Sequence, residues 1–122
     1  METRSTILIV DDDAAFCLML TNMVGSLGYH VLTTLNASNV PYYELSDGDF
    51  VFIDIMMPGT DGFDALRILA KHNFICSVVL MSGSPARLAE AEKLAKKLEV
   101  KITGVLHKPF RLDDVKHVLE GI

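Results

Sequence analysis

The chain has 122 residues, 50% of them hydrophobic and 22% charged, which suits one domain with a single core and excludes a disordered segment. Sixteen acidic residues against eleven basic ones give a net charge of −5, so the surface is not expected to bind nucleic acid directly. No apolar run approaches the roughly 18 residues of a membrane helix, and the first residues lack the pattern of a signal peptide. We therefore expect a soluble, cytoplasmic protein without membrane contact. Its two cysteines, Cys17 and Cys76, lack metal-binding spacing and are expected to be reduced and buried.

Three short segments in the first half of the chain predict β-strands. Residues 7–10 form an apolar run, and residues 50–53 form another, ending at Asp54, that is expected to be buried on both faces of a sheet. Residues 30–34 are rich in β-branched side chains but alternate only weakly, so they predict an edge strand.

Helices are predicted between and after these strands. Asp13 is expected to cap a helix that ends at Gly28. Its apolar positions at helical spacing are Phe16, Leu20, Met23 and Leu27. Residues 36–49, interrupted by Pro41, predict only a short helix toward the end of that stretch. A further helix is expected from Gly62, with the inward-facing residues Phe63, Leu66, Leu69 and Ala70.

The second half of the chain continues the alternation. Strands are predicted at residues 75–81 and 100–107. Between them, Ser84 and Pro85 have the order of a helix cap and first helical residue. The inner face of that helix is expected to consist of Leu88, Ala91, Leu94, Ala95 and Leu98, and the apolar face of a last helix of Leu112, Val115, Val118 and Leu119. Five strands alternating with helices predict an α/β fold with a five-stranded parallel sheet covered on both sides.

Polar side chains stand where the predicted strands end. Asp11 and Asp12 follow the first strand, and Asp54, Ser82 and Lys108 stand at the ends of the third, fourth and fifth. The carboxyl ends of parallel strands lie at one edge of a sheet, where ligands bind, so we expect one site. Three carboxylates repel one another unless a cation intervenes, and Mg²⁺ prefers such oxygen ligands. The ion, the ammonium and the hydroxyl could then hold a phosphoryl group while one carboxylate attacks it.

These motifs resemble the receiver domain of two-component response regulators, over essentially the whole chain, residues 1–122. The matching elements are the apolar run before Asp11-Asp12, the segment around Asp54 with Met57-Pro58-Gly59-Thr60-Asp61-Gly62, Ser82-Gly83, and Lys108-Pro109-Phe110. The resemblance implies a flavodoxin-like, doubly wound (βα)5 fold with strand order 2-1-3-4-5.

The same resemblance implies a phosphorylation switch. Asp54 would accept a phosphoryl group from a sensor histidine kinase or a phosphotransfer protein, with Ser82 as the switch hydroxyl and Lys108 holding the phosphate. The Mg²⁺ ligands would be Asp11, Asp12, Asp54 and the backbone carbonyl of Met56. The domain would be a phosphotransfer acceptor with at most slow self-dephosphorylation, rather than an enzyme. It would switch an output domain or effector protein, or form a homodimer.

Two features depart from the usual receiver pattern. The position three residues before Lys108 usually carries Tyr or Phe, whose rotation accompanies switching, and here it is Val105. Valine is small and stiff, so that aromatic switch cannot operate. The segment between Ser82 and Lys108 is also longer than expected. In this respect the chain resembles receivers fused to EAL-type cyclic-di-GMP phosphodiesterases, which would place an EAL domain beyond Ile122.

Two alternatives fit parts of the pattern. A haloacid-dehalogenase-like phosphohydrolase would use Asp11 as nucleophile. Its signature would comprise Asp11-x-Asp13, Ser82, Lys108 and Asp113-Asp114. That interpretation gives Asp54 no role and places the last acidic pair in the first turn of a helix, where it suits the helix dipole. The other alternative, suggested by Val105, is a phosphorylation-independent interaction domain.

Overall fold

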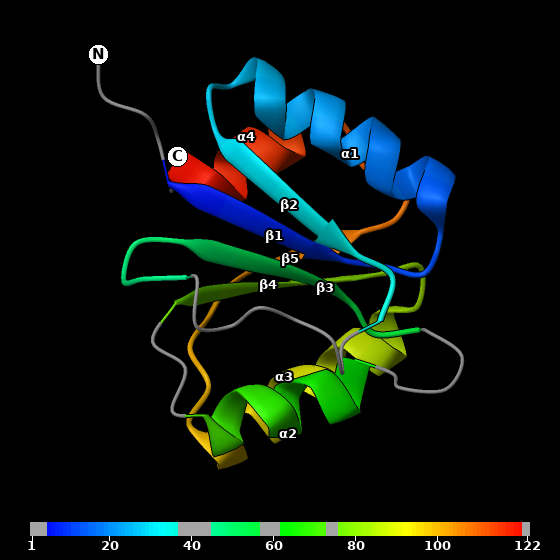
Figure 1. The fold of residues 1–122 in the computed structure, drawn as a ribbon. Helices are drawn as coiled ribbons and strands as arrows, with labels where there is room; N and C mark the ends of the chain where they lie inside the picture. The colour runs from blue at the N-terminus through cyan, green and yellow to red at the C-terminus, as the bar shows by residue number, and fades with distance from the viewer. Residues whose placement is uncertain (1–4, 37–44, 57–61, 73–75, 121–122) are drawn as a thin grey trace.

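The computed structural model describes residues 5–36, 45–56, 62–72 and 76–120. Within these residues, five strands alternate with four helices (Figure 1). The elements are β1 (Thr6–Val10), α1 (Ala14–Ser26), β2 (His30–Thr34), β3 (Phe50–Asp54), α2 (Gly62–Lys71), β4 (Ser77–Ser82), α3 (Pro85–Leu98), β5 (Ile102–His107) and α4 (Leu112–Glu120). The strands form one parallel sheet in the order β2-β1-β3-β4-β5, which confirms the predicted fold class and strand order.

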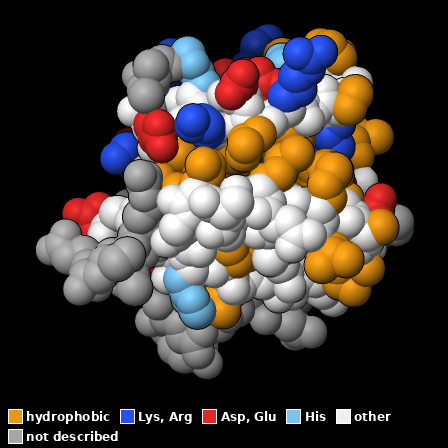
Figure 2. Space-filling view, turned by 90° about the horizontal axis from the view of Figure 1, so that it is seen from above, with side chains coloured by type: hydrophobic (Ala, Val, Ile, Leu, Met, Phe, Trp, Pro, Cys, Tyr) orange, Lys and Arg blue, Asp and Glu red, His pale blue; other side chains and the backbone are white. Residues whose placement is uncertain are grey.

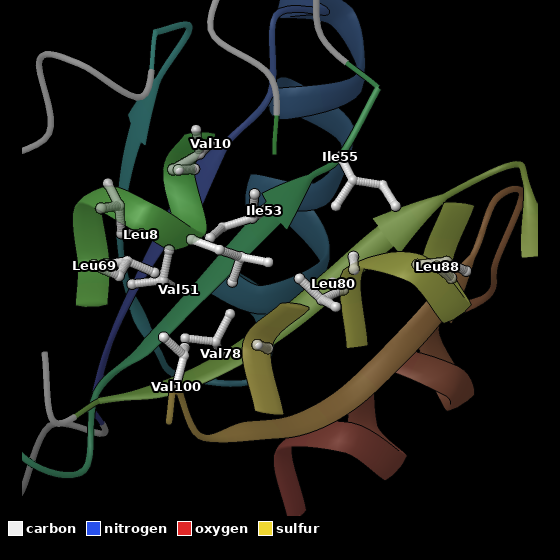
Figure 3. Packing of buried hydrophobic residues seen from close by; sticks show 14 residues of the cluster. Leu8, Val10, Val51, Ile53, Ile55, Leu69, Val78, Leu80, Leu88 and Val100 are labelled. Atoms are coloured by element: carbon white, nitrogen blue, oxygen red, sulfur yellow. The ribbon is translucent and has the colours of Figure 1, made fainter. Parts of the chain in front are cut away.

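The helices cover both faces of the sheet, α1 and α4 on one side and α2 and α3 on the other (Figure 1). Successive strand residues point to opposite faces, so each strand contributes to two hydrophobic clusters. On β3, Phe52 belongs to the cluster under α1 and α4, whereas Val51 and Ile53 belong to the cluster under α2 and α3. Figure 3 shows the second cluster, in which Leu80 of β4 lies on the side of α3 and its Leu88. The predicted burial of the third strand on both faces is thus confirmed.

The predicted helix starts are confirmed by their caps. The Asp13 carboxylate accepts a hydrogen bond from the Phe16 amide at 3.1 Å, and the Ser84 hydroxyl accepts one from the Arg87 amide at 3.3 Å. Both bonds satisfy an amide that has no partner within its helix. Gly28, just after α1, has φ of 93°, a conformation that glycine adopts without steric cost.

The buried face of α1 differs from the predicted one. Its buried side chains are Cys17, Leu20 and Val24, so only Leu20 of the predicted positions is fully buried. The reason is that α1 is apolar on almost every side, and the spacing alone does not show which side faces the sheet. Leu18 and Met19 remain exposed. Seen from above, from the side on which α1 lies in Figure 1, the surface shows a band of hydrophobic side chains (Figure 2).

Some predicted boundaries also differ. The fifth strand begins at Ile102 instead of residue 100, because the Val100 amide still donates a hydrogen bond to the Ala95 carbonyl of α3, whose C-cap residue Glu99 has φ of 61°. The fourth strand begins at Ser77, and the predicted start at residue 75 lies outside the described residues. The predicted short helix before the third strand lies mostly outside them too, and residues 45–49 form a turn. No helix among the described residues is long and apolar enough to span a membrane.

Asp49, in the turn before β3, is a buried structural residue that the sequence analysis did not identify. Its carboxylate accepts hydrogen bonds from the Thr6 amide at 2.9 Å and from the Ser46 amide at 2.8 Å. The turn and the start of β1 are therefore joined through one side chain, which satisfies two backbone amides at once.

Candidate functional site

The predicted site residues meet at the carboxyl edge of the sheet. Asp11 directly follows β1 and Asp54 ends β3, and these two strands are neighbours in which Val10 pairs with Ile53. Asp11, Asp12 and Asp54 can each offer one carboxylate oxygen, and these three oxygens lie within 4.8 Å of one another. The parallel arrangement thus brings together acidic residues that lie far apart in the sequence, as predicted.

Burial distinguishes the three acids. Asp11 is fully buried, Asp54 is 5% exposed, and Asp12 is exposed. Each buried carboxylate accepts one backbone hydrogen bond two residues further along the chain: Asp11 Oδ1 from the Asp13 amide at 3.0 Å, and Asp54 Oδ1 from the Met56 amide at 3.1 Å. These bonds fix the orientation of both carboxylates and leave the Oδ2 atoms for other partners.

The Oδ2 atoms face Lys108, which follows β5. Its Nζ donates a hydrogen bond to Asp11 Oδ2 at 2.7 Å and lies 3.4 Å from Asp54 Oδ2. The Lys108 amide donates to the Ser82 carbonyl at 2.9 Å, which ties this segment to the end of β4. The ammonium therefore bridges two buried carboxylates, which offsets the cost of burying them.

The pKa of Asp54 is raised above the ordinary value for an aspartate. Burial is the main cause, and the negative charge of Asp11 acts in the same direction. The Met56 amide and the Lys108 ammonium oppose the rise in pKa, because both stabilise the ionised form. A further cation in the cluster would act in the same sense as Lys108.

Ser82 lies at the same edge of the sheet, at the end of β4. It is fully buried, and its hydroxyl oxygen accepts a hydrogen bond from the Ser84 amide at 3.0 Å. Because this bond uses the oxygen as acceptor, the hydroxyl hydrogen remains a donor. Asp54 pairs with Met81, the residue before Ser82, so the hydroxyl belongs to the strand end beside Asp54.

The acidic pair of the phosphohydrolase alternative lies elsewhere. Asp113 and Asp114 are in the first turn of α4, as predicted, and the Asp114 carboxylate accepts a hydrogen bond from the Arg111 amide at 2.9 Å. Asp114 thus helps to cap the helix, and the group of acids among the described residues that could hold a metal ion does not include Asp113 or Asp114.

Two residues of α1 contact the site without having been predicted to do so. The Cys17 thiol donates a hydrogen bond to the Asp11 carbonyl at 3.3 Å, and burial raises its pKa to about 11, which disfavours the thiolate form. The ring of Phe16 lies under Lys108, with Nζ 3.8 Å from the ring centre. The sequence places Phe16 and Cys17 in the first turn after the Asp13 cap, but it does not show which face of that helix lies against Lys108.

The fold and the acidic sheet edge together define a flavodoxin-like α/β domain of the kind that binds ligands at the carboxyl ends of its strands. A family model described as "Response regulator receiver domain" matches residues 7–120. The chain therefore belongs to the response regulator receiver domain family, whose members are phosphoacceptor domains of two-component signalling rather than ordinary enzymes. This membership overrules the phosphohydrolase alternative.

Relatives and solved structures agree with this assignment. The chain is 32% identical over 119 residues to the DNA-binding transcriptional regulator NtrC of Azospirillum brasilense, covering 97% of this chain and 24% of NtrC. It is 29% identical over 115 residues to the autoinducer 1 sensor kinase/phosphatase LuxN of Vibrio harveyi, covering 93% of this chain and 13% of LuxN. The chain thus spans a quarter or less of these two relatives.

The crystal structure of a response regulator from Colwellia psychrerythraea matches with a TM-score of 0.83 at 28% identity, covering 98% of this chain and 96% of that one. The chemotaxis response regulator CheY4 of Vibrio cholerae matches with a TM-score of 0.76 at 22% identity and 98% coverage of both chains. At this identity the match shows a similar fold only. NtrC and LuxN are not named as cyclic-di-GMP phosphodiesterases, so the EAL assignment stays a prediction.

Proposed function

We propose that Asp54 is the phosphoacceptor of this receiver domain and that the acidic cluster holds Mg²⁺ during phosphorylation. The observation that supports this most directly is that Asp11, Asp12 and Asp54 each place one carboxylate oxygen within 4.8 Å of the other two, while the Lys108 ammonium bridges Asp11 and Asp54. Three carboxylates and one ammonium leave two formal negative charges, which a divalent cation neutralises. Carboxylate oxygens are also the ligands that Mg²⁺ prefers, so the residues present fit the ion.

In this proposal the ligands of the ion are Asp11, Asp12, Asp54 and the backbone carbonyl of Met56. When bound, Mg²⁺ supplies positive charge to the oxygens of an incoming phosphoryl group. Of the three acids, Asp54 suits attack best. Its Oδ2 is 3.4 Å from Lys108 Nζ, whereas the corresponding Asp11 oxygen is held at 2.7 Å and is fully buried.

The reaction is a transfer of one phosphoryl group. An oxygen of Asp54 forms a bond to phosphorus as the bond to the donor nitrogen of a phosphohistidine breaks, and the electron pair leaves with the imidazole. Lys108 then meets a phosphoryl oxygen with its ammonium, and the Ser82 hydroxyl donates a hydrogen bond to another. Hydrolysis of the acyl phosphate by the domain itself is at most slow in this proposal.

The phosphorylated state would be transmitted through the Ser82 segment and α3. Ser82 is tied to the start of α3 by its hydrogen bond from the Ser84 amide, which belongs to the N-cap residue of that helix. Val105 is half-buried and packs against the cluster under α2 and α3, so it offers no aromatic ring for the usual switch. Movement of the Ser82 segment and α3, or a change in dimerisation, would carry the signal.

The partners proposed are a sensor histidine kinase or phosphotransfer protein as donor, in the cytoplasm, and an output domain or effector protein as target. NtrC is named a DNA-binding transcriptional regulator and LuxN a sensor kinase/phosphatase, so related domains serve different whole proteins. For this chain, we propose two ways in which phosphorylation would act: through an EAL domain after Ile122, or through formation of a homodimer.

The test is the intact mass of the protein after incubation with acetyl phosphate, with Mg²⁺ or with EDTA. Wild-type protein should gain one phosphoryl group only with Mg²⁺, and Asp54→Asn should gain none. Asp64→Asn is a matched control, because Asp64 is an exposed acid on α2 that pairs with Arg67. Persistent labelling of Asp54→Asn would overturn the assignment. No labelling of wild type would favour the phosphorylation-independent interaction domain.

A further inference from the structure

The Lys108 ammonium has a third contact in addition to its two carboxylates. Its Nζ lies 3.8 Å from the centre of the Phe16 ring, close enough for a cation–π interaction. The contact joins the first turn of α1 to the segment after β5, two elements that the sequence separates by most of its length. Lys108 thus has Asp11 and Asp54 on one side and an aromatic face on another.

The ring of Phe16 is itself held in place. Its backbone amide donates to the Asp13 carboxylate in the cap of α1. Its ring packs against Phe110 at a centroid distance of 5.6 Å and an interplanar angle of 89°, an edge-to-face arrangement that aromatic pairs favour. Phe110 is two residues after Lys108. Phe16 therefore contacts the lysine and the phenylalanine of the Lys108-Pro109-Phe110 segment at once.

We propose that Phe16 is a positioning residue for Lys108: its ring holds the ammonium at the Asp54 side of the site, where an incoming phosphoryl group meets it. This inference rests on the proposed function, in which Asp54 is phosphorylated and Lys108 contacts the phosphate. Phe16 itself touches no reacting atom. It acts through the lysine, whose four-carbon chain has many rotamers when nothing restrains it.

The Phe16 ring can hold the Lys108 ammonium even where a metal ion competes with that ammonium for a carboxylate. Asp11 is a proposed ligand of a cation, and its Oδ2 also accepts the lysine hydrogen bond at 2.7 Å. A cation at the cluster and the ammonium therefore compete for the same carboxylate. The face of Phe16 attracts the ammonium without using any carboxylate oxygen. Lys108 can lose its bond to Asp11 and still remain over the site.

The first test detects the contact itself and needs no metal or phosphate. Protons above an aromatic ring are shielded, so the side-chain methylene protons next to Nζ of Lys108 should resonate upfield of those of the other lysines in NMR spectra recorded in EDTA. The shift should disappear in Phe16→Leu. Lys108 protons at ordinary positions in the wild-type protein would overturn the proposal, whether or not Asp54 is the phosphoacceptor.

The second test is a double-mutant cycle on the rate of phosphorylation by acetyl phosphate at saturating Mg²⁺. Phe16→Leu keeps an apolar side chain but removes the ring, and should slow the reaction about threefold to tenfold. Phe16→Trp should restore the rate, because indole is the strongest of the aromatic partners for a cation. In a Lys108→Met background, where no ammonium remains, Phe16→Leu should have no further effect.

A matched control is available on the other side of the sheet. Phe63 of α2 lies under the Arg87 guanidinium, 4.9 Å from the ring centre, so Phe63→Leu removes a similar ring–cation contact elsewhere in the molecule. It should leave the phosphorylation rate unchanged. If Phe16→Leu slows the reaction equally in the wild-type and Lys108→Met backgrounds, or if Phe16→Trp does not restore the rate, the positioning role is wrong. If wild type is not phosphorylated at all, the proposed function fails and the NMR measurement alone decides the contact.

Discussion

Replacing Lys108 by methionine would leave two buried carboxylates without the ammonium that now bridges them. The side chain of Asp11 is fully buried and that of Asp54 is 7% exposed, so their charges are poorly solvated. Removing one partner of a fully buried ion pair costs about 3–5 kcal/mol. Because the Lys108 side chain is 23% exposed and partly screened, we expect a smaller loss of unfolding free energy, about 2–3 kcal/mol.

The loss should depend on Mg²⁺. An ion that binds only the folded state at a hundred times its dissociation constant adds about 2.7 kcal/mol of stability, so it can replace most of what the ammonium contributed. In the wild-type protein the positive charge of Lys108, 2.7 Å from Asp11 Oδ2 and 3.4 Å from Asp54 Oδ2, repels the ion. Mg²⁺ should therefore stabilise Lys108→Met more than it stabilises wild type.

The assay is urea unfolding followed by circular dichroism, since the chain has no tryptophan. In EDTA the midpoint of Lys108→Met should be lower by about 1.3–2 M urea, for a slope of about 1.5 kcal/mol per molar. Lys93→Met, which changes an exposed lysine on α3, is the matched control and should unfold like wild type. Equal midpoints for Lys108→Met and wild type in EDTA, or an equal gain from Mg²⁺, would refute the reasoning.

Three further predictions concern stability and thiol chemistry. A Cβ at Gly62 would lie 2.3 Å from Ile55 Cα, so Gly62→Ala should lower the unfolding free energy measured in urea by about 2–3 kcal/mol. A Cβ at Gly25 would meet nothing within 4 Å, so Gly25→Ala should raise the unfolding free energy by about 0.5–1 kcal/mol. A Gly62→Ala variant as stable as wild type would contradict the contact. Asp49→Ala should lower the unfolding free energy by about 2–3 kcal/mol, because two backbone amides lose their acceptor. Asp49→Asn should lower it less, because the side-chain oxygen of asparagine can still accept one of these hydrogen bonds. Equal losses for the two variants would argue against Asp49 as the acceptor that joins the turn to β1. Burial raises the pKa of Cys76 from 9.0 to about 11, because the folded state disfavours the thiolate. The neutral thiol therefore contributes to the stability of the folded state fully below pH 9, and this contribution should be lost as the pH rises to about 11. The corresponding check is alkylation at about pH 8, below the ordinary thiol pKa, which should be slow in native protein and fast in urea; rapid native reaction would disprove the burial.

Much of the site was predictable because its residues follow strands. Apolar runs ending in Asp11-Asp12, Asp54, Ser82 and Lys108 predict parallel strands, and parallel strands place their carboxyl ends at one edge. The periodicity of the last three helices was also informative, since their apolar and charged residues separate clearly. One position was wrong: Leu112, predicted on the apolar face of α4, is exposed at the first residue of that helix. The periodicity of α1 was not informative, because its residues are apolar on nearly all sides and their spacing fits several buried faces.

The sequence alone determined the order of strands and helices along the chain, the apolar runs that form the core strands and the polar residues at the strand ends. These follow from local periodicity and from the geometry that every parallel sheet shares. Only the tertiary structure decided that Asp11 and Asp54 are buried while Asp12 is exposed, that Lys108 bridges the first two, and that Phe16 lies under its ammonium. These contacts join residues far apart in the chain, and they depend on how each helix rotates and packs against the sheet, which local sequence does not specify.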